Sequence, residues 1–407
     1  MSVAEIAVTG LGLLTPAGAG VDATWRRVCE GGSTVAATRA DLAGCPVDFC
    51  CAIPEPDTSG LGRRTTYRLD RFTRLAVLAA REALADSGLD TASWDGARVG
   101  VVMGCGLGGA ATWEKQHARL LERGPDAVSP LLLPMMLPNM VAGEVALACG
   151  ARGPGCVTST ACASGATAIS VARDLLTSHQ CDVVIAGGTE SVNTPLIVTG
   201  FANLGTLSTR CDDPAGASRP FDADRDGFVM AEAAGILVLE RAADAAARRR
   251  RPRALLVGCG GANDAHHPTA SHPEARGARE ALHAALDDAG FAAGDVDHVN
   301  AHGTATPLND TMEAKAISTV LPDGPPVTST KGVLGHSLGA TGAVEAALTV
   351  LTIERSTIPP TANLDSPDPA VDLNLVTKTA LHQPVRAALS NSFGFGGHNV
   401  VLAFRAV

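Results

Sequence analysis

Apolar and polar positions follow two periods that alternate along the whole chain. Short apolar runs bounded by turn residues predict buried strands, and between them apolar positions recur at helical spacing. Because the two signals alternate throughout, the pattern favours an α/β fold with buried sheets. The expected strands are 6–8, 99–103, 156–158, 182–186, 254–257, 296–301, 327–330, 389–392 and 400–404. The expected helices are 70–87, 111–121, 278–289 and those with the apolar stripes 168–176 and 344–351.

Several polar and glycine positions set the expected ends of these elements. The glycines at 10 and 12 and the pair Gly187-Gly188 are interpreted as turns that end two strands. A further helix is expected to begin at Asn309 or Asp310, with Glu313 placed as its reciprocal cap.

The tetrapeptide Val-Thr-Ser-Thr occurs twice, at 157–160 and at 327–330. The first copy runs into a segment that carries Cys162, and the second runs into one that ends at His336. Two similar strand-to-helix turns predict an internal duplication whose copies meet at one active site. We expect two layered halves, 1–250 and 251–407, with the basic segment Arg248–Arg253 as the hinge between them.

Composition narrows the function classes. The net charge of −10 argues against nucleic acid as a partner. The sequence shows no N-terminal signal pattern and no apolar run of about 20 residues, which argues against a membrane span. The 11 cysteines are an odd number without a CxxC pair. We therefore expect a reduced, cytoplasmic protein.

Cys162 is the strongest candidate nucleophile. It is expected at the first turn of a crossover helix, where exposed N–H groups and the positive end of the helix dipole would lower its pKa. Its neighbours Ala161, Ala163 and Gly165 are small and leave room for a substrate.

Two histidines and an ion-pair candidate accompany the cysteine. His302 follows an expected strand, where binding groups gather in α/β sheets. His336 has glycines on both sides and precedes a helix. Lys331 and Glu345 could form either a buried or a surface ion pair. The Gly-rich loop 394–397 offers backbone N–H groups that can hold a developing oxyanion, although a tight hairpin would look the same.

Taken together, these segments resemble the elongating β-ketoacyl-acyl carrier protein synthases of fatty acid and type II polyketide synthesis. The resemblance covers almost the whole chain and includes the motifs 220–229 and 359–364. It implies the thiolase fold, an α/β architecture of two pseudo-duplicated βαβαβαββ halves in five layers, αβαβα. It also implies a dimer, either a homodimer or a heterodimer with a chain-length-factor homologue.

The resemblance implies a decarboxylative Claisen condensation between an acyl thioester and malonyl-acyl carrier protein. Cys162 would carry the acyl chain, and the N–H groups of Cys162 and Phe395 would form the oxyanion hole. His302 and His336 would hold the enolate as neutral imidazoles. The supporting pair would be Lys331 and Glu345. No metal or redox cofactor would be required.

The same resemblance implies roles for residues around the centre. Thr304 and Thr306 would bind pantetheine, Leu107 would limit acyl length, and Ala163, where relatives often carry threonine, could alter the pocket volume. Phe395, with its neighbours Gly394 and Gly396, would form one gate. A second mobile loop, 264–269, would include His267 and Thr269. An acidic acyl carrier protein would dock on Arg63, Arg64, Arg68 and Arg71.

Two other functions compete with this one. The segment 104–109 formally matches GxGxxG after a strand and before a helix, which is also typical of an NAD(P)-dependent oxidoreductase. A non-catalytic partner subunit would share the fold, although such subunits lack the nucleophilic cysteine. The fatty acid and polyketide pathways share all of these motifs.

Overall fold

The computed structural model describes residues 5–35 and 39–407. The N-terminal half contains β1 (Ile6–Thr15), β2 (Gly18–Ala19), α1 (Val21–Glu30), α2 (Arg63–Arg68), α3 (Arg71–Ser87), β3 (Val99–Gly104), α4 (Ala110–Arg123), α5 (Leu132–Met136), α6 (Met140–Cys149), β4 (Gly155–Thr158), the 3-10 turn η5 (Ala161–Ala163), α7 (Ser164–Thr177), β5 (Val183–Glu190), α8 (Pro195–Asn203), β6 (Ala233–Arg241) and α9 (Ala242–Ala247).

The C-terminal half contains β7 (Ala254–Asn263), α10 (Arg276–Ala289), β8 (His298–Asn300), α11 (Pro307–Val320), β9 (Val327–Thr328), α12 (Lys331–Leu334), the 3-10 turn η8 (Leu338–Ala340), α13 (Thr341–Arg355), β10 (Thr357–Ile358), β11 (Leu381–His382), β12 (Ala387–Gly394) and β13 (His398–Arg405). Helix α11 begins at Pro307, so the expected start at Asn309 or Asp310 is wrong, and Glu313 lies inside the helix.

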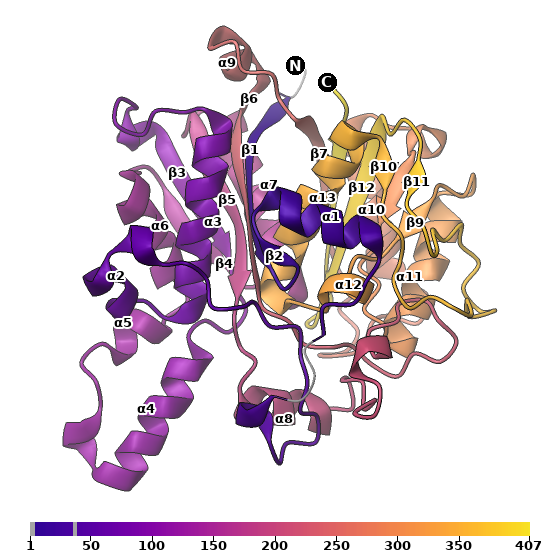
Figure 1. Cartoon of the computed structure of the whole chain (residues 1–407). Coiled ribbons are helices and arrows are strands. Elements are labelled where there is room, and N and C mark those ends of the chain that lie inside the picture. Colours follow the sequence, from indigo (N-terminus) through magenta and orange to yellow (C-terminus); the bar gives the residue numbers. More distant parts are fainter. Residues whose placement is uncertain (1–4, 36–38) are drawn as a thin grey trace.

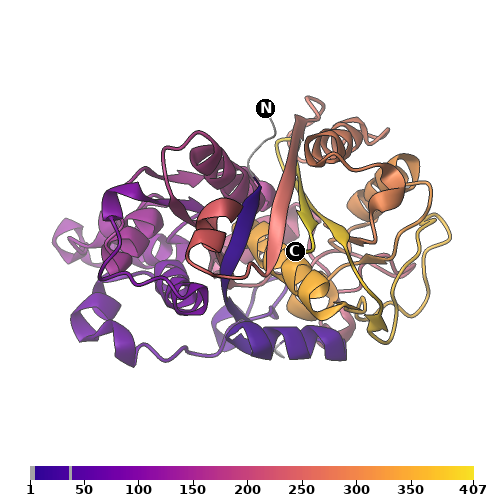
Figure 2. The ribbon, with the colours of Figure 1, turned by 90° about the horizontal axis from the view of Figure 1, so that it is seen from above.

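The two halves repeat one topology. In the first, the strand order is β4-β3-β5-β6-β1, and in the second it is β9-β8-β12-β13-β7. The first three strands of each set are parallel, and the last two pair antiparallel. Strands β1 and β7 join the two sets through Ile6–Val8 and Ala254–Leu256, and lie side by side at the centre of Figure 2. This duplicated arrangement confirms the predicted thiolase-type fold.

Helices α7 and α13 lie between the two sets of strands (Figure 1). Helices α3 and α6 cover the outer face of the first set, and α10 and α11 cover the outer face of the second (Figures 1 and 2). The apolar core follows these layers, because successive strand residues point to opposite faces. Val184 of β5 packs in the cluster around α7 and α13, whereas Val183 and Ile185 pack in the cluster around α3 and α6.

Some glycines interpreted as turns lie inside strands. Strand β1 continues through Gly10 and Gly12, and β5 continues through Gly187 and Gly188. A Cβ on Gly12 would lie 1.9 Å from the carbonyl oxygen of Ala79 in α3. These glycines therefore allow a helix or a neighbouring strand to approach the sheet closely, and the predicted turns are wrong.

The two central helices cross at matched residues. A Cβ on Gly165 of α7 would lie 2.7 Å from the backbone nitrogen of Ala343 in α13. A Cβ on Gly342 of α13 would lie 2.8 Å from the backbone nitrogen of Ala166 in α7. The first turns of both helices are therefore in reciprocal contact, and they belong to the segments that follow the two Val-Thr-Ser-Thr copies.

The basic segment 248–253, which we expect to link the two halves, is held in place by ion pairs and hydrogen bonds. Arg253 makes an ion pair with Asp86 at 2.8 Å, and Arg248 donates to Glu240 at 2.6 Å and to the carbonyl oxygen of Ser87 at 2.9 Å. These contacts tie the segment to α3 and β6. Where the chain should be divided stays a prediction, because the halves share one sheet.

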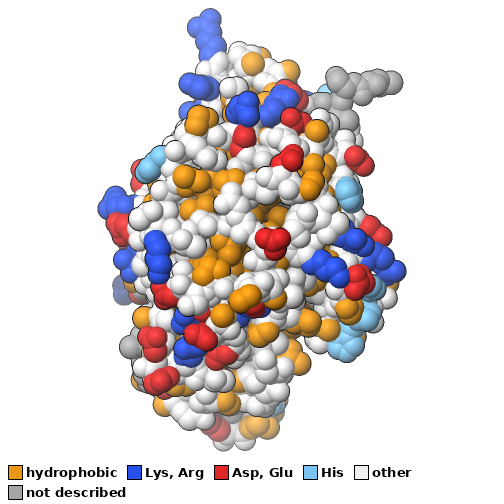
Figure 3. Space-filling view, turned by 90° about the vertical axis from the view of Figure 1, so that its right-hand side faces the viewer, with side chains coloured by type: hydrophobic (Ala, Val, Ile, Leu, Met, Phe, Trp, Pro, Cys, Tyr) orange, Lys and Arg blue, Asp and Glu red, His pale blue; other side chains and the backbone are white. Residues whose placement is uncertain are grey.

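The surface does not gather charge of one sign on the face shown in Figure 3, where acidic and basic side chains are interspersed around apolar ones. Among the helices of residues 5–35 and 39–407, none combines the length and the apolar character needed to cross a membrane.

Candidate active site

Cys162 lies in a tight turn between β4 and α7. Ala161, just before it, has a φ of 49°, a left-handed conformation that non-glycine residues rarely adopt. Ser164 closes the turn, because its hydroxyl donates to the carbonyl oxygen of Ala161 at 2.6 Å and accepts from the N–H of Thr160 at 2.9 Å. The strained turn presents Cys162 to a cavity, and the side chain is partly buried.

The environment of Cys162 shifts its pKa in the direction opposite to our expectation. Burial raises the pKa of the thiol to about 12. The positive charge of Lys331 and the backbone N–H groups of Phe395 and Cys162 lower this pKa, but by less. One reason is that α7 begins at Ser164, two residues beyond the cysteine. The resting residue is therefore a thiol, and a nearby base has to take its proton.

His336 is the base nearest to the thiol. Its Nε2 lies 3.1 Å from Sγ of Cys162. The backbone N–H of His336 donates to the carbonyl oxygen of Val229 at 2.8 Å. The carbonyl oxygen of His336 accepts from the N–H of Ala231 at 3.0 Å. The ring of Phe228 packs edge-on against the imidazole with a centroid distance of 5.2 Å.

His302 follows β8 and faces the same cavity. A buried carboxylate shapes its loop: Glu313 of α11 accepts the backbone N–H groups of His302 at 2.8 Å and Gly303 at 2.7 Å. The rings of His302 and His336 lie 5.4 Å apart. One ligand-type atom from each histidine and Sγ of Cys162 all lie within 4.8 Å of one another.

The pair formed by Lys331 and Glu345 is buried. The Nζ–Oε1 distance is 2.5 Å, and the two side chains are 1% and 2% exposed, which decides for the buried alternative. The ammonium also donates to the carbonyl oxygen of His302 and lies 3.5 Å from its Nδ1. A cation facing Nδ1 favours the tautomer that carries its proton on Nε2.

Both histidines are neutral near pH 7. Burial is the main cause that lowers the pKa of His302 and of His336 well below the ordinary value, and the charge of Lys331 adds to it. Burial also raises the pKa of Glu345 to about 7, opposed by Lys331. The centre thus combines a thiol with two neutral imidazoles. This set can accept a proton from sulfur and donate hydrogen bonds to an anion.

The cavity in front of these residues has a volume of about 600 Å³. Thr304 and Thr306 line it and share a hydroxyl contact of 2.9 Å. Other predicted residues that line it are Leu107, Thr269, Gly394 and Phe395. Three predicted residues, Ala163, His267 and Gly396, are not among the residues that line this cavity. Ala163 is buried in the turn beneath Cys162.

Two loops at the mouth of this cavity are joined by hydrogen bonds. The N–H of Gly396 donates to the carbonyl oxygen of Pro268 at 2.7 Å. Nδ1 of His267 accepts from the backbone N–H groups of Thr269 and Ala270 at 3.2 and 3.1 Å. His267 and Gly396 therefore belong to the loops that border the cavity, rather than to its wall.

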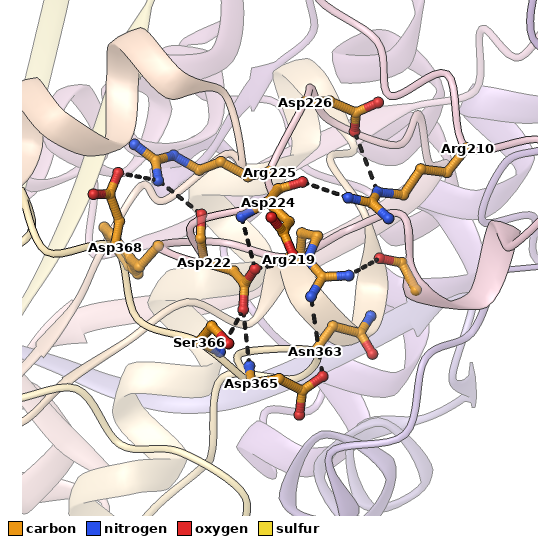
Figure 4. A network of polar contacts seen from close by, with 12 residues as sticks. Arg210, Arg219, Asp222, Asp224, Arg225, Asp226, Asn363, Asp365, Ser366 and Asp368 are labelled. Atoms are coloured by element: carbon orange, nitrogen blue, oxygen red, sulfur yellow. Dashed lines mark hydrogen bonds and ion pairs between the residues drawn. The ribbon is translucent and has the colours of Figure 1, made fainter.

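A polar network holds the loop that carries Phe228 (Figure 4). The carboxylate of Asp222 accepts backbone N–H groups from residues 365 and 366 at 2.9 and 2.8 Å. Arg225 donates to Asp368 at 2.6 Å and to the carbonyl oxygen of Asp222 at 2.8 Å. A loop from the first half is thus fixed to the second half, next to His336.

This geometry agrees with comparisons to known proteins. Residues 4–245 match the family described as "Beta-ketoacyl synthase, N-terminal domain", and residues 253–365 match "Beta-ketoacyl synthase, C-terminal domain". The chain belongs to the β-ketoacyl synthase family. This membership confirms the resemblance found in the sequence.

The β-ketoacyl synthases similar to this chain include proteins named 3-oxoacyl-[acyl-carrier-protein] synthase 2. The one from Synechocystis is 43% identical and the one from Staphylococcus aureus 41%, and each match covers 98% of both chains. Among solved structures, the ishigamide ketosynthase/chain length factor has a TM-score of 0.94 at 31% identity and covers 100% of both chains. A type II polyketide ketosynthase in complex with its acyl-carrier protein has a TM-score of 0.92 at 30% identity, again with 100% of both chains covered.

The structure separates the four arginines predicted as a docking patch. Arg63 and Arg64 are exposed on α2. Arg68 forms a two-pronged pair with Glu144 of α6. Arg71 is 22% exposed and is paired at 2.7 Å with Glu232, the residue just before β6. Arg63 and Arg64 are thus the exposed members of the predicted patch, Arg68 keeps 42% of its side chain exposed, and docking on these arginines stays a prediction.

The GxGxxG segment of this β-ketoacyl synthase does not offer a phosphate site. The backbone N–H groups of Gly106, Leu107 and Gly108 donate to the carboxylate of Glu190, at distances of 2.7, 3.2 and 3.3 Å. A dinucleotide would need these same N–H groups for its pyrophosphate. An internal anion already occupies them, so the oxidoreductase alternative is wrong.

Sequence reasoning missed the roles of three groups of residues at this centre. Glu190 holds the glycine turn, and Glu313 holds the loop of His302. The third group is aromatic and surrounds the histidines: Phe228 against His336, and Phe393 against His302 with a centroid distance of 5.9 Å. The sequence shows an acid at the end of an expected strand, but it does not show that Glu190 is buried or which backbone N–H groups bind it, because those donors lie far away in the sequence.

Proposed function

We propose that this β-ketoacyl synthase catalyses a decarboxylative Claisen condensation of an acyl group on Cys162 with malonyl-acyl carrier protein. The product is 3-oxoacyl-acyl carrier protein. The observation that carries the proposal is the meeting of Cys162 Sγ with His336 Nε2 at 3.1 Å, beside a second neutral histidine. The relatives named 3-oxoacyl-[acyl-carrier-protein] synthase support it.

The first half-reaction loads the acyl group. Sγ of Cys162 attacks the thioester carbonyl of the incoming carrier protein, and its proton passes to the departing pantetheine sulfur, with His336 Nε2 as the nearest base. The tetrahedral oxyanion accepts from the N–H groups of Cys162 and Phe395. Nδ1 of His336 has no hydrogen-bond partner among the described residues. Its tautomer is therefore free to exchange between the two half-reactions.

The second half-reaction forms the carbon–carbon bond. Malonyl-acyl carrier protein loses carbon dioxide, and the electron pair of the broken bond becomes an enolate. The enolate oxygen accepts from Nε2–H of His302 and of His336. The enolate carbon then attacks the acyl thioester on Cys162, and the cysteine leaves as a thiolate that regains a proton from solvent. Lys331 keeps the His302 proton on Nε2 throughout.

The partners follow from the same proposal. Both substrates arrive on acyl carrier protein, and the exposed Arg63 and Arg64 fit its acidic surface. A second chain, either a copy of this one or a chain-length-factor homologue, would cover β4, which is the edge strand of the sheet and is exposed at Gly155 and Cys156. We also propose that the enzyme acts in the cytoplasm and needs no metal or redox cofactor.

The pathway is tested by the acyl group that the protein accepts. Intact mass spectrometry after incubation with a panel of acyl- and polyketidyl-carrier proteins would identify the adduct on Cys162. Preference for saturated acyl chains indicates fatty acid elongation, and preference for polyketide intermediates indicates polyketide assembly. A protein that shows no adduct with any member of the panel, and releases no carbon dioxide from malonyl-carrier protein, would contradict the proposed function.

A further inference from the structure

Glu190, the last residue of β5, is a buried acid without a cationic partner among the described residues. It is 0% exposed and lines the catalytic cavity. Its carboxylate is instead surrounded by five donors from two distant segments. These are the N–H groups of Gly106, Leu107 and Gly108, the thiol of Cys105 at 3.3 Å, and the N–H of Gly339 at 3.2 Å.

The two segments that share this carboxylate are both parts of the active site. One is the turn after β3, which places Leu107 in the cavity wall. The other is η8, which begins two residues after His336. Their contact with the carboxylate is close: a Cβ on Gly106 would lie 2.9 Å from Oε2 of Glu190, and a Cβ on Gly339 would lie 2.5 Å from it. Both segments need glycine here because they pack directly on this oxygen.

The carboxylate also acts on the nucleophile through its charge. The charges that act on Cys162 are those of Lys331 and Glu190, and the two histidines lie within 4.8 Å of its sulfur. Lys331 lowers the pKa of the thiol, and the negative charge of Glu190 raises it. Burial raises the pKa of Glu190 itself, while its backbone N–H donors act in the opposite direction and favour the ionised form.

We propose that Glu190 is a positioning residue of the condensation. Its carboxylate sets the separation between the cavity wall at Leu107 and the turn after His336. Its negative charge also adds to the effect of burial, which is the main cause of the raised pKa of Cys162. This inference rests on the proposed function for its catalytic part. The electrostatic part concerns the free thiol and can be measured without any carrier protein.

The decisive variant is Glu190→Gln, which keeps the shape and removes the charge. An amide offers one acceptor oxygen, and its NH₂ group would face N–H donors. We expect the midpoint pH for alkylation of Cys162 by iodoacetamide to move to lower pH, because the anion that opposes the thiolate is gone. We also expect kcat for carbon dioxide release from malonyl-carrier protein to fall roughly 10- to 100-fold, the effect of losing hydrogen bonds to a charged group. KM should change little.

A second variant, Glu190→Asp, separates position from charge. The shorter acid keeps its charge but cannot reach both segments, so the alkylation midpoint should stay at the wild-type value while kcat falls. Cys211→Ser is the control, because it replaces an exposed cysteine that does not line the cavity, and it should leave both quantities unchanged. If Glu190→Gln does not fold, Glu190→Asp with wild-type kcat is the result that overturns the positioning role.

The outcomes distinguish this inference from the proposed function. An unchanged alkylation midpoint in Glu190→Gln would refute the electrostatic role, whatever the activity. Wild-type kcat in a folded Glu190→Gln would refute the positioning role. A wild-type protein that releases no carbon dioxide would instead contradict the proposed function, and the thiol titration would still report on Glu190.

Discussion

The two Val-Thr-Ser-Thr segments lead from a strand to a central helix in the same way, yet they differ in what lies between. Three residues, Ala161–Ala163, separate Thr160 from the start of α7, whereas ten residues, 331–340, separate Thr330 from the start of α13. The short connection forms a strained turn around one cysteine. The long one contains Lys331 and His336. In the proposed reaction, the same strand-to-helix frame serves covalent chemistry in one half and anion stabilisation in the other.

The two Val-Thr-Ser-Thr segments also differ in how deeply they are buried. The first segment belongs to the edge strand β4 and is partly exposed, whereas Val327–Thr330 is fully buried. Ser159 of this segment also lines the cavity in front of Cys162. A buried segment is needed around Lys331, because a low-dielectric surrounding strengthens the effect of its charge on both histidines. The difference shows how a duplicated turn can acquire a second function without a change in the frame.

The largest expected effect comes from removing the cysteine of the short turn. Cys162→Ala should abolish acyl loading, with a fall in overall condensation on the order of 10⁴-fold or more, because the covalent intermediate cannot form. Carbon dioxide release from malonyl-carrier protein should persist, since both histidines remain. Intact mass spectrometry and a carbon dioxide assay measure the two steps. Equal acyl labelling of the variant and the wild type would remove Cys162 as the nucleophile.

Replacing the two histidines should affect the two half-reactions differently. His302→Ala and His336→Ala should each slow carbon dioxide release about 10²- to 10³-fold, the usual effect of losing one donor to an oxyanion. Of the two variants, His336→Ala alone should also slow acyl loading, because Nε2 of His336 lies 3.1 Å from Sγ of Cys162. Single-turnover loading measures this difference. Near-normal decarboxylation in both variants would show that the donor assignment is wrong.

Removing the cation of the long connection should affect stability and pH dependence together. Lys331→Met leaves Glu345 buried without a partner, which should lower the free energy of unfolding by about 3–5 kcal/mol in urea titrations. The charge of Lys331 lowers the pKa of both histidines, so its loss should raise these values. The acid limb of the decarboxylation profile should then move to higher pH. Lys331→Arg, which keeps the charge, is the control.

The reciprocal helix contact provides a matched pair of variants. Gly165→Ala and Gly342→Ala each place a Cβ against the backbone of the other helix, at 2.7 and 2.8 Å. Each should lower the free energy of unfolding by about 1–3 kcal/mol, as overpacking does. The double variant should cost less than the sum, because one separation of the helices relieves both contacts. Strict additivity would mean that the two contacts are independent.

The smallest effect is expected on α2, outside the two turns. Arg63→Glu with Arg64→Glu should raise KM for carrier-protein substrates several-fold at low salt, and the effect should shrink as salt is added. Acyl loading from a small pantetheine thioester should not change. Arg71→Ala is the contrasting variant, because its guanidinium pairs with Glu232, and it should lower stability rather than docking. Unchanged KM at low salt would contradict the docking prediction.

The fold could be predicted from the sequence, and so could the convergence of distant segments at one active site. Hydrophobic periodicity and long motifs carry that information. Cys162, His302 and His336 were expected together, and their atoms do meet in one cavity. Glycines were a weaker guide: Gly12 looks like a turn, but it serves the close approach of α3. The local pattern contains no sign of which helix will lie against a strand.

The pKa values and buried charges of the site were the hardest features to predict from the sequence. A cysteine next to a helix start predicts a lowered pKa, but burial raises the pKa of Cys162, because desolvation depends on every layer that covers the thiol. Glu190 was missed for a similar reason, since its donor Gly339 lies 149 residues further along the chain. Such contacts arise only when the two halves are packed together.

The reciprocal contact between α7 and α13 also limits how the two halves can evolve. Gly165 and Gly342 are related by the pseudo-two-fold symmetry of the duplication, and each helix start abuts the other. A drift of either half away from this axis would displace the nucleophile and the anion-binding groups at once. The two connections between strand and helix differ in length and in side chains, while the helices that follow them keep one shared contact.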